Sequence, residues 1–278
     1  MAEIESLGFA VRLGDGVLAR RGFTAGTAEA RLAQLRDLLA DPEVAAIWCA
    51  RGGAGALHLL PRLDRAWLRA MPKLLIGYSD ATVLHAWLGQ AGLASVHGPM
   101  VAWEMADGSY DRASLWHALT GAGAPWASGP GELRALAAGT AEGVLRGGCL
   151  SLLAALAGTP WALRAGAEPT LLFVEDVDER PYRVDRLLRQ LRLSGALGGV
   201  VGIVFGEMRG CAPRAGEGYG LDEVLLEALE GLDLPVAAGL SSGHASRPVV
   251  ALPLGVRARL ACGDDGDARL RVMEAPVS

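Results

Sequence analysis

Lysine is almost absent from this chain of 278 residues. Lys73 is its only lysine among 26 lysines and arginines, and the net charge is −5. The arginines are scattered among 31 acidic residues, so no basic run is available to follow a phosphate backbone. We therefore expect no nucleic-acid partner.

Paired cysteines are also lacking. The four cysteines, Cys49, Cys149, Cys211 and Cys262, lie far apart, with no C-x-x-C spacing of the kind that builds zinc or redox sites. They are typical of small buried residues in a reducing compartment. No set of His, Cys and carboxylate residues has metal-ligand spacing, and we expect no metal.

Export and membrane signals are missing too. The first residues, MAEIESLGFAV, have acids where a secretory signal needs a basic region and an apolar core. The longest uncharged apolar run, 147–163, is interrupted by Gly158, Thr159 and Pro160, which favours a core helix and turn over a membrane span. We expect a soluble, cytoplasmic protein without a membrane partner.

What is present is an alternation of apolar strand-like runs and helical patterns. FAVRL (9–13), VAAIWCA (44–50), KLLIGYS (73–79) and ASVHGP (94–99) are strand-like, with helical stretches between them. This pattern predicts an N-terminal α/β domain with a doubly wound, mostly parallel sheet. A Gly, Ala, Pro and Ser-rich stretch follows, which we interpret as a linker. We place the domains at 1–122 and 140–278, with the linker at 123–139 and a smaller mixed α/β fold in the second domain.

A single serine stands where the third of these strands meets a helix, in KLLIGYSDATVLHAWLG. A sharp strand-to-helix turn is where several hydrolase folds hold a serine nucleophile, so Ser79 is a candidate. The alternative is that Ser79 only caps the helix. Lys73 cannot assist it as a base, because six residues of extended strand span about 20 Å.

A nucleophilic serine needs a base and an acid. His244 is our first candidate for the base because it stands in a Ser-Gly-rich loop between apolar strands, and His97, at the end of ASVHGP, competes with it. His58, His85 and His117 fit helix faces. Glu175 is the candidate acid because it ends the apolar run LLFVE; the alternative is that it joins Asp176, Asp178 and Glu179 in a solvated, helix-capping cluster.

The glycine-rich loop CARGGAGAL matches neither the P-loop nor the dinucleotide fingerprint. A loop of this kind can instead offer backbone N–H groups to an oxyanion. In GGCLSLL, the glycine at 147 predicts a close approach of strand and helix that leaves no room for a side chain.

Six blocks together resemble the LD-carboxypeptidase family of serine peptidases, which also includes the microcin C immunity peptidases. They are RGGAGALHLLPRLD, PKLLIGYSDATVLH, HGPM, EGVLRGGCLSLLAALAGT, FVEDVDERPYRVDRLLRQL and GHASRPVVALPLG, in the family's order and approximate spacing. The resemblance implies Ser79 as nucleophile, Glu175 as triad acid and His244 as base. It implies an oxyanion hole made by the backbone N–H groups of Asp80 and of a glycine in RGGAG, for which we choose Gly53.

The resemblance further implies two domains, with Ser79 on the first and the acid and base on the second, in a homodimer without cofactors. The implied reaction is hydrolysis of the amide between an L-centre (L-Lys or meso-diaminopimelate) and terminal D-alanine in a small murein tetrapeptide, as in peptidoglycan recycling. One alternative is hydrolysis of an aminoacyl-nucleotide toxin. Another is a non-catalytic ligand-binding protein that kept the fold.

The sequence departs from the family in three places. Ala54 replaces the tyrosine of RGGYG, and Cys149 replaces the asparagine of GGN. The family's first apolar strand, ending in Ala-Pro-Ser, has no counterpart. We expect that strand in the middle of the sheet, where its absence leaves two neighbouring strands unpaired, one of them leading to Ser79. We therefore expect the natural product to begin about 10 to 25 residues upstream.

Overall fold

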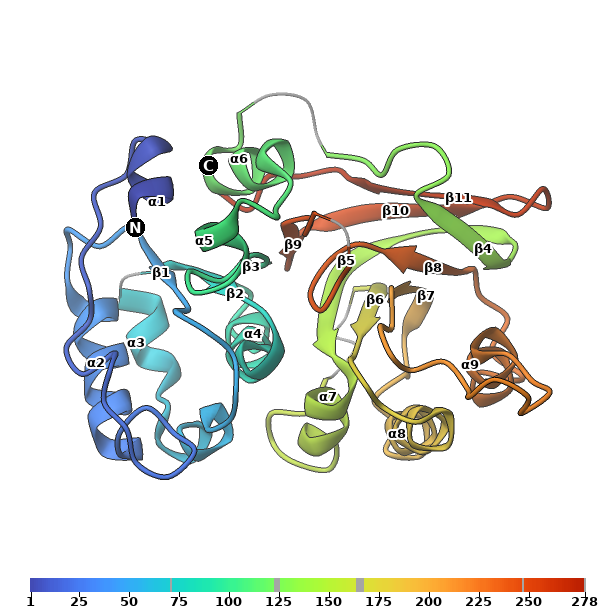
Figure 1. Cartoon of the computed structure of the whole chain (residues 1–278), viewed down its shortest axis with the longest axis horizontal. Helices are drawn as coiled ribbons and strands as arrows, with labels where there is room; N and C mark the ends of the chain where they lie inside the picture. Colours follow the sequence, from blue (N-terminus) through green and yellow to red (C-terminus); the bar gives the residue numbers. More distant parts are fainter. Residues whose placement is uncertain (71, 123–125, 164–167, 247, 278) are drawn as a thin grey trace.

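A computed structural model describes residues 1–70, 72–122, 126–163, 168–246 and 248–277. Two sheets lie side by side, each with its own helices (Figure 1). The first is a four-stranded sheet and the second is a closed seven-stranded barrel. This is a mixed α/β fold, as the sequence predicts.

The four-stranded sheet has the order β1-β2-β3-β9. Its members are β1 (Ala46–Trp48), β2 (Leu74–Gly77), β3 (Ser95–His97) and β9 (Leu252–Leu254). The first three are parallel, whereas β9 returns from the far end of the chain and pairs antiparallel to β3. The end of the chain is thereby joined to the sheet that leads to Ser79.

Helices cover both faces of this sheet. Neighbouring residues of β2 point to opposite faces, so each of them packs in a different core. Leu75 packs in a core with α2 (Ala28–Ala40), α4 (Thr82–Gln90) and α3 (Arg65–Ala70), near the short 3₁₀ turns η1 (Ala56–His58) and η2 (Leu60–Arg62). Ile76 packs in another core with α1 (Ala2–Ser6), α5 (Glu104–Asp107) and α6 (Arg112–Thr120).

The barrel closes in the order β10-β11-β4-β8-β7-β6-β5. The pairs β5–β6, β6–β7 and β7–β8 are parallel, and the other pairs are antiparallel. The strands are β4 (Leu133–Ala137), β5 (Gly139–Cys149), β6 (Thr170–Glu175), β7 (Val200–Gly206), β8 (Val236–Leu240), β10 (Arg257–Cys262) and β11 (Asp267–Val272).

Three helices, α7 (Leu150–Leu156), α8 (Pro181–Leu193) and α9 (Leu221–Ala228), pack against the parallel strands (Figure 1). Helix α8 shows why they do so: Val184, Leu188 and Leu191 recur at helical spacing and are fully buried against β6 and β7, while arginines occupy other positions. The parallel half of the barrel therefore has a core inside and another beneath these helices.

Several sequence expectations differ from this fold. FAVRL (9–13) forms no strand, and residues 133–137, which we placed in the linker, form β4 of the barrel. The composition does not reveal β4, because its sequence, LRALA, contains none of the β-branched or aromatic residues that are typical of strands. The parallel strands run β1-β2-β3 without a reversal of order, so the doubly wound arrangement is not confirmed.

The expected gap beside the strand of Ser79 is also not found. Strand β2 is paired with β1 on one edge and β3 on the other. Within the described residues, β1 has a partner on one edge only, so the open edge lies one strand away from Ser79.

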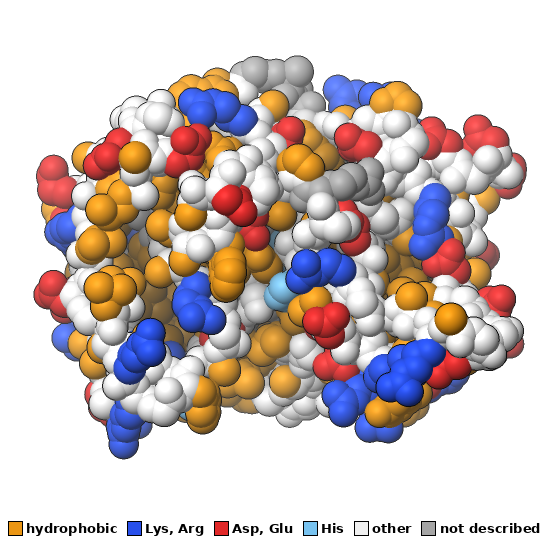
Figure 2. All heavy atoms as spheres, in the orientation of Figure 1, with side chains coloured by type: hydrophobic (Ala, Val, Ile, Leu, Met, Phe, Trp, Pro, Cys, Tyr) orange, Lys and Arg blue, Asp and Glu red, His pale blue; other side chains and the backbone are white. Residues whose placement is uncertain are grey.

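The surface carries charges of both signs. Figure 2 shows basic and acidic side chains interspersed over one face, with apolar atoms between them. No helix in the described ranges is long and apolar enough to cross a membrane. All four cysteines are free thiols, and Cys149, Cys211 and Cys262 are buried.

Candidate active site

Ser79 stands on a sharp strand-to-helix turn. It follows β2 directly and opens η3 (Ser79–Ala81), which continues into α4. Its φ is 62°, a left-handed conformation that is uncommon for a residue with a Cβ atom. Gly77 permits the turn, since a Cβ there would lie 2.7 Å from Cys49 Cβ. A strained serine at such a turn is the geometry of a nucleophile elbow.

The capping alternative for Ser79 fits the structure poorly. Neither η3 nor α4 begins with a side-chain cap, and the residue before η3 is Tyr78. Among the residues that the structure describes, no hydrogen bond occupies the Ser79 hydroxyl. The side chain is half-exposed and is available for chemistry.

The glycine loop RGGAG packs against this turn. A Cβ on Gly52 would lie 2.9 Å from Ser79 Cβ and 3.0 Å from Ser79 Oγ, so the loop backbone touches the serine. Asp80 fastens the two segments together, because its carboxylate accepts a 2.8 Å hydrogen bond from the Ala56 N–H. Gly53 has a φ of 119°, and a Cβ there would point into open space.

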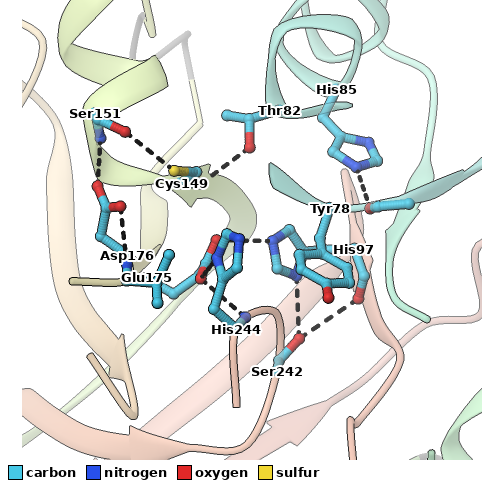
Figure 3. Close-up of polar contacts among 12 residues, drawn as sticks. Tyr78, Thr82, His85, His97, Cys149, Ser151, Glu175, Asp176, Ser242 and His244 are labelled. Carbon is cyan, nitrogen blue, oxygen red and sulfur yellow. Dashed lines mark hydrogen bonds and ion pairs between the residues drawn. The ribbon is translucent and has the colours of Figure 1, made fainter. Parts of the chain in front are cut away.

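Glu175 and His244 form a hydrogen-bonded pair on the barrel. Glu175 is the last residue of β6, and His244 lies in the loop between β8 and β9. His244 Nδ1 lies 2.8 Å from Glu175 Oε2, and the His244 backbone N–H donates to the same oxygen at 3.1 Å (Figure 3). The two residues meet because the carboxyl ends of parallel strands share one edge of the barrel.

His244 lies beside the Ser79 turn. Its ring packs edge-on against Tyr78, with 5.0 Å between ring centroids (Figure 3). Tyr78 is held in turn by Glu104, which accepts a 2.7 Å hydrogen bond from the phenol. The structure thus brings the predicted base and acid together, next to the residue that precedes the predicted nucleophile.

The charges of the pair are set by burial and by each other. Burial alone would raise the pKa of Glu175, but the hydrogen bond with His244 and the electrostatic interactions with His244 and His97 outweigh it and lower that pKa to about 2. Burial alone would lower the pKa of His244, but the Glu175 carboxylate outweighs this and raises it above its ordinary value. Glu175 is therefore an ionised acceptor near neutral pH.

Comparison with known proteins identifies the family to which this chain belongs. A family model described as the LD-carboxypeptidase N-terminal domain matches residues 1–98, and one described as the C-terminal domain matches residues 142–260. The chain belongs to the LD-carboxypeptidase family. The resemblance of the six sequence blocks is confirmed.

Individual relatives agree with this membership. A probable murein peptide carboxypeptidase of Bacillus subtilis is 35% identical, over 99% of this chain and 86% of its own. The crystal structure of a muramoyltetrapeptide carboxypeptidase from Oxalobacter formigenes superposes with a TM-score of 0.83 at 31% identity, covering 99% of this chain and 93% of that one. The microcin C7 self-immunity protein MccF of Escherichia coli is 28% identical over 84% of this chain and 76% of its own. These likenesses support a hydrolase of the carboxypeptidase type.

The other four histidines differ from His244 in their burial and contacts. His97, the rival candidate for the base, is fully buried and faces the other oxygen of Glu175, with its Nε2 3.7 Å from Glu175 Oε1. His85 is buried under the turn, where its ring nitrogens contact Ser95 Oγ and the Gly77 carbonyl oxygen. Burial lowers the pKa of His85 to about 3, with a further contribution from His97. His58 is exposed, and His117 is buried on α6.

The acids after Glu175 have different roles from it. Asp176 accepts hydrogen bonds from the backbone N–H groups of Ser151 and Val177, so it holds the start of α7. Asp178 adopts a φ of 56° in the turn, and Glu179 forms an ion pair with Arg183 one helical turn away at 3.5 Å. Asp176 therefore has a capping role but is buried rather than solvated, with 4% exposure, whereas Glu175 is 1% exposed and faces His244.

Sequence reasoning missed three contributors to the site. It did not anticipate the carboxylate of Asp80 as a link to the glycine loop, the Tyr78–Glu104 hydrogen bond, or Ser242 beneath His97. Their partners are 24, 26 and 145 residues away in the sequence, so local patterns carry no signal for them.

The two substituted family positions, Ala54 and Cys149, occupy different environments. Ala54 is exposed in the glycine loop. Cys149 is buried at the end of β5, and its backbone N–H donates to Thr82 Oγ1 at 2.9 Å. The preceding glycines allow this contact: a Cβ on Gly148 would lie 2.5 Å from Thr82 Oγ1, and one on Gly147 would strike the Phe173 carbonyl oxygen. The close approach predicted at Gly147 is to the neighbouring strand β6, and the approach to a helix occurs one residue later, at Gly148.

Across the described ranges, no three His, Cys, Asp or Glu side chains gather as they would around a metal ion.

Proposed function

We propose that this protein is a serine carboxypeptidase in which Ser79 is the nucleophile, His244 the general base and Glu175 the acid that orients it. The observation that carries the proposal is the 2.8 Å contact between His244 Nδ1 and Glu175 Oε2, beside the turn that presents Ser79. In chain order the triad is Ser, Glu, His.

The Glu175–His244 contact fixes which nitrogen of His244 is free to act. An ionised carboxylate can only accept, so Nδ1 carries the proton that lies between the two residues. Nε2 is then unprotonated and takes the proton of Ser79 Oγ as the hydroxyl attacks the carbonyl carbon. The raised pKa of His244 makes it a stronger base for this transfer.

The tetrahedral intermediate carries a negative oxygen that needs donors in place. We assign this role to the backbone N–H groups of Asp80 and Gly53. The support is the packing of Gly52 on Ser79 and the Asp80–Ala56 hydrogen bond, which hold the glycine loop against the turn. The protonated His244 then donates its proton to the leaving amine. A water molecule, deprotonated by the same nitrogen, releases the acyl group from Ser79.

For the substrate, we propose a murein tetrapeptide cleaved between its L-centre and the terminal D-alanine. The support is the name of relatives such as the muramoyltetrapeptide carboxypeptidase whose structure covers 99% of this chain. We further propose that the enzyme acts on peptides in the cytoplasm as a homodimer and uses no cofactor.

A second substrate class is favoured by the likeness to MccF. A solved structure of a protein of that name, in complex with aspartyl sulfamoyl adenosine, superposes with a TM-score of 0.80 at 25% identity. The chemistry is the same, because that class also presents an amide to a serine nucleophile. Ala54 is exposed in the glycine loop, and its side chain is smaller than the tyrosine of the family's RGGYG, so a substrate group could lie against the loop there.

The experiment offers both substrates to the purified protein side by side and identifies products by mass spectrometry. Release of D-alanine from the tetrapeptide, absent with Ser79→Ala, supports the carboxypeptidase assignment. Cleavage of aminoacyl-sulfamoyl-adenosine alone would replace it with the second class. Turnover of neither substrate, under conditions in which a family member is active, would favour a non-catalytic ligand-binding protein.

A further inference from the structure

Glu175 faces two histidines, and the proposed triad uses only one of them. His244 occupies Oε2, while His97, at the end of β3, points its Nε2 at Oε1 from 3.7 Å (Figure 3). Both atoms are buried, and neither has a hydrogen-bond partner among the described residues. Since a buried polar atom without a partner is costly, two such atoms facing each other form a contact that can tighten into a hydrogen bond.

Ser242 decides which nitrogen of His97 carries the proton. Its Oγ lies 3.1 Å from His97 Nδ1 and a longer 3.5 Å from the His97 carbonyl oxygen. If the hydroxyl donates to Nδ1, the proton of neutral His97 lies on Nε2 and faces the carboxylate. The opposite tautomer would set a nitrogen lone pair against an ionised oxygen, which is repulsive.

The surroundings keep His97 in this place. Its ring packs edge-on against Phe173 with 5.0 Å between centroids, and it is fully buried. Gly243 leaves room for the contact, because a Cβ there would lie 2.6 Å from Glu175 Cδ and 2.8 Å from His97 Cε1. His97 belongs to the four-stranded sheet and Glu175 to the barrel, so the contact joins the two halves of the site.

We propose that His97 is a positioning residue: its Nε2–H holds Oε1 of Glu175, so that Oε2 stays directed at His244, and Ser242 sets the tautomer that makes this possible. The catalytic consequence rests on the proposed function. A carboxylate held at one oxygen only can turn about its terminal bond, whereas one held at both oxygens keeps the imidazole aligned with Ser79.

The test compares His97→Leu, which removes the donor, with His97→Gln, whose amide N–H can replace Nε2–H. We expect His97→Leu to lower kcat about 10- to 100-fold with little change in KM, the loss expected when one buried charged acceptor loses its donor. We expect His97→Gln to stay within a few-fold of wild type. His117→Gln, at another buried histidine far from Glu175 in the fold, controls for loss of a buried imidazole and should leave kcat unchanged.

A second readout needs no substrate. The proton shared by His244 Nδ1 and Glu175 gives a hydrogen-bonded imidazole N–H signal in NMR, assigned by its loss in Glu175→Gln. We expect that signal to broaden or move upfield in His97→Leu and to be retained in His97→Gln. If no substrate is turned over but the signal behaves in this way, the proposed function fails and the positioning role stands.

Ser242→Ala adds a variant that inserts no bulk, in case His97→Leu does not fold. We expect it to lower kcat several-fold and to perturb the same N–H signal. Equal losses in His97→Leu and His97→Gln would show that packing rather than the donor matters. The proposal is overturned if both His97→Leu and Ser242→Ala leave the N–H signal unchanged. If His97→Leu does not fold, an unchanged signal in Ser242→Ala alone overturns it.

Discussion

Adding one methyl group at Gly52 should disable the site while leaving the fold largely intact. The methyl carbon would stand 2.9 Å from Ser79 Cβ, 3.0 Å from Ser79 Oγ and 3.5 Å from Met100 Cε. Carbon atoms in contact prefer about 3.5 Å or more, so Gly52→Ala must push the Ser79 turn and the glycine loop apart by about 0.6 Å. Both proposed parts of the reaction centre, the nucleophile and the oxyanion loop, would move.

The size of the effect follows from this displacement. A misplacement of 1 Å can cost about 100-fold in rate, so a shift of this size should lower kcat about 10- to 100-fold. Overpacking costs about 1–3 kcal/mol in folding free energy, and replacing glycine returns about 0.4–1 kcal/mol through the unfolded state. The free energy of unfolding should therefore fall by at most about 2 kcal/mol, a small change beside the loss of rate.

The assay measures kcat on the substrate found active, together with chemical denaturation. Gly220→Ala is the matched control, because a Cβ there meets nothing within 4 Å and the residue directly precedes α9 on the barrel. We expect the control to keep full activity. Wild-type kcat in Gly52→Ala would refute the claim that the glycine loop touches a reacting serine.

Three further predictions address the mechanism and specificity. Activity should survive EDTA, because no metal takes part in the proposed steps; loss in EDTA with recovery on adding zinc would exclude the serine mechanism. The reaction needs neutral His244, and Glu175 raises the pKa of His244. The acid limb of the kcat/KM profile should therefore lie above pH 6.5 and should move to lower pH in Glu175→Gln. An acid limb that does not move would show that the pair does not control the base. Ala54→Tyr should change the ratio of kcat/KM between the murein tetrapeptide and aminoacyl-sulfamoyl-adenosine by more than it changes stability; an unchanged ratio would remove this position from substrate recognition.

Local sequence patterns predicted the elements that bear the site well. The runs at β2, β6 and β8 are strongly apolar and end in polar residues, so the edge that holds Glu175 and His244 could be anticipated. The family resemblance then selected Ser79, Glu175 and His244 from several candidates. The structure agrees in pairing Glu175 with His244 and in placing that pair beside the Ser79 turn.

Features that depend on distant pairing could not be predicted in the same way. Strand β4 lies in a segment with the composition of a linker and is a strand because β8 and β11 flank it. FAVRL has strand-like composition but no pairing partner among the described residues. The sequence presents His97, at a strand end, as a competing base; only the fold shows that it faces Oε1 of Glu175 while His244 takes Oε2.

The most direct test of the central claim is the turnover of Ser79→Ala on the best substrate identified. Ser and Ala share a Cβ atom, so the substitution leaves the strain of the left-handed turn unchanged and removes only the hydroxyl. With circular dichroism and melting temperature unchanged, the proposed triad predicts a loss of kcat of about 10⁴-fold or more, matched by His244→Ala. A rate near wild type in Ser79→Ala would contradict the assignment of this serine as the nucleophile.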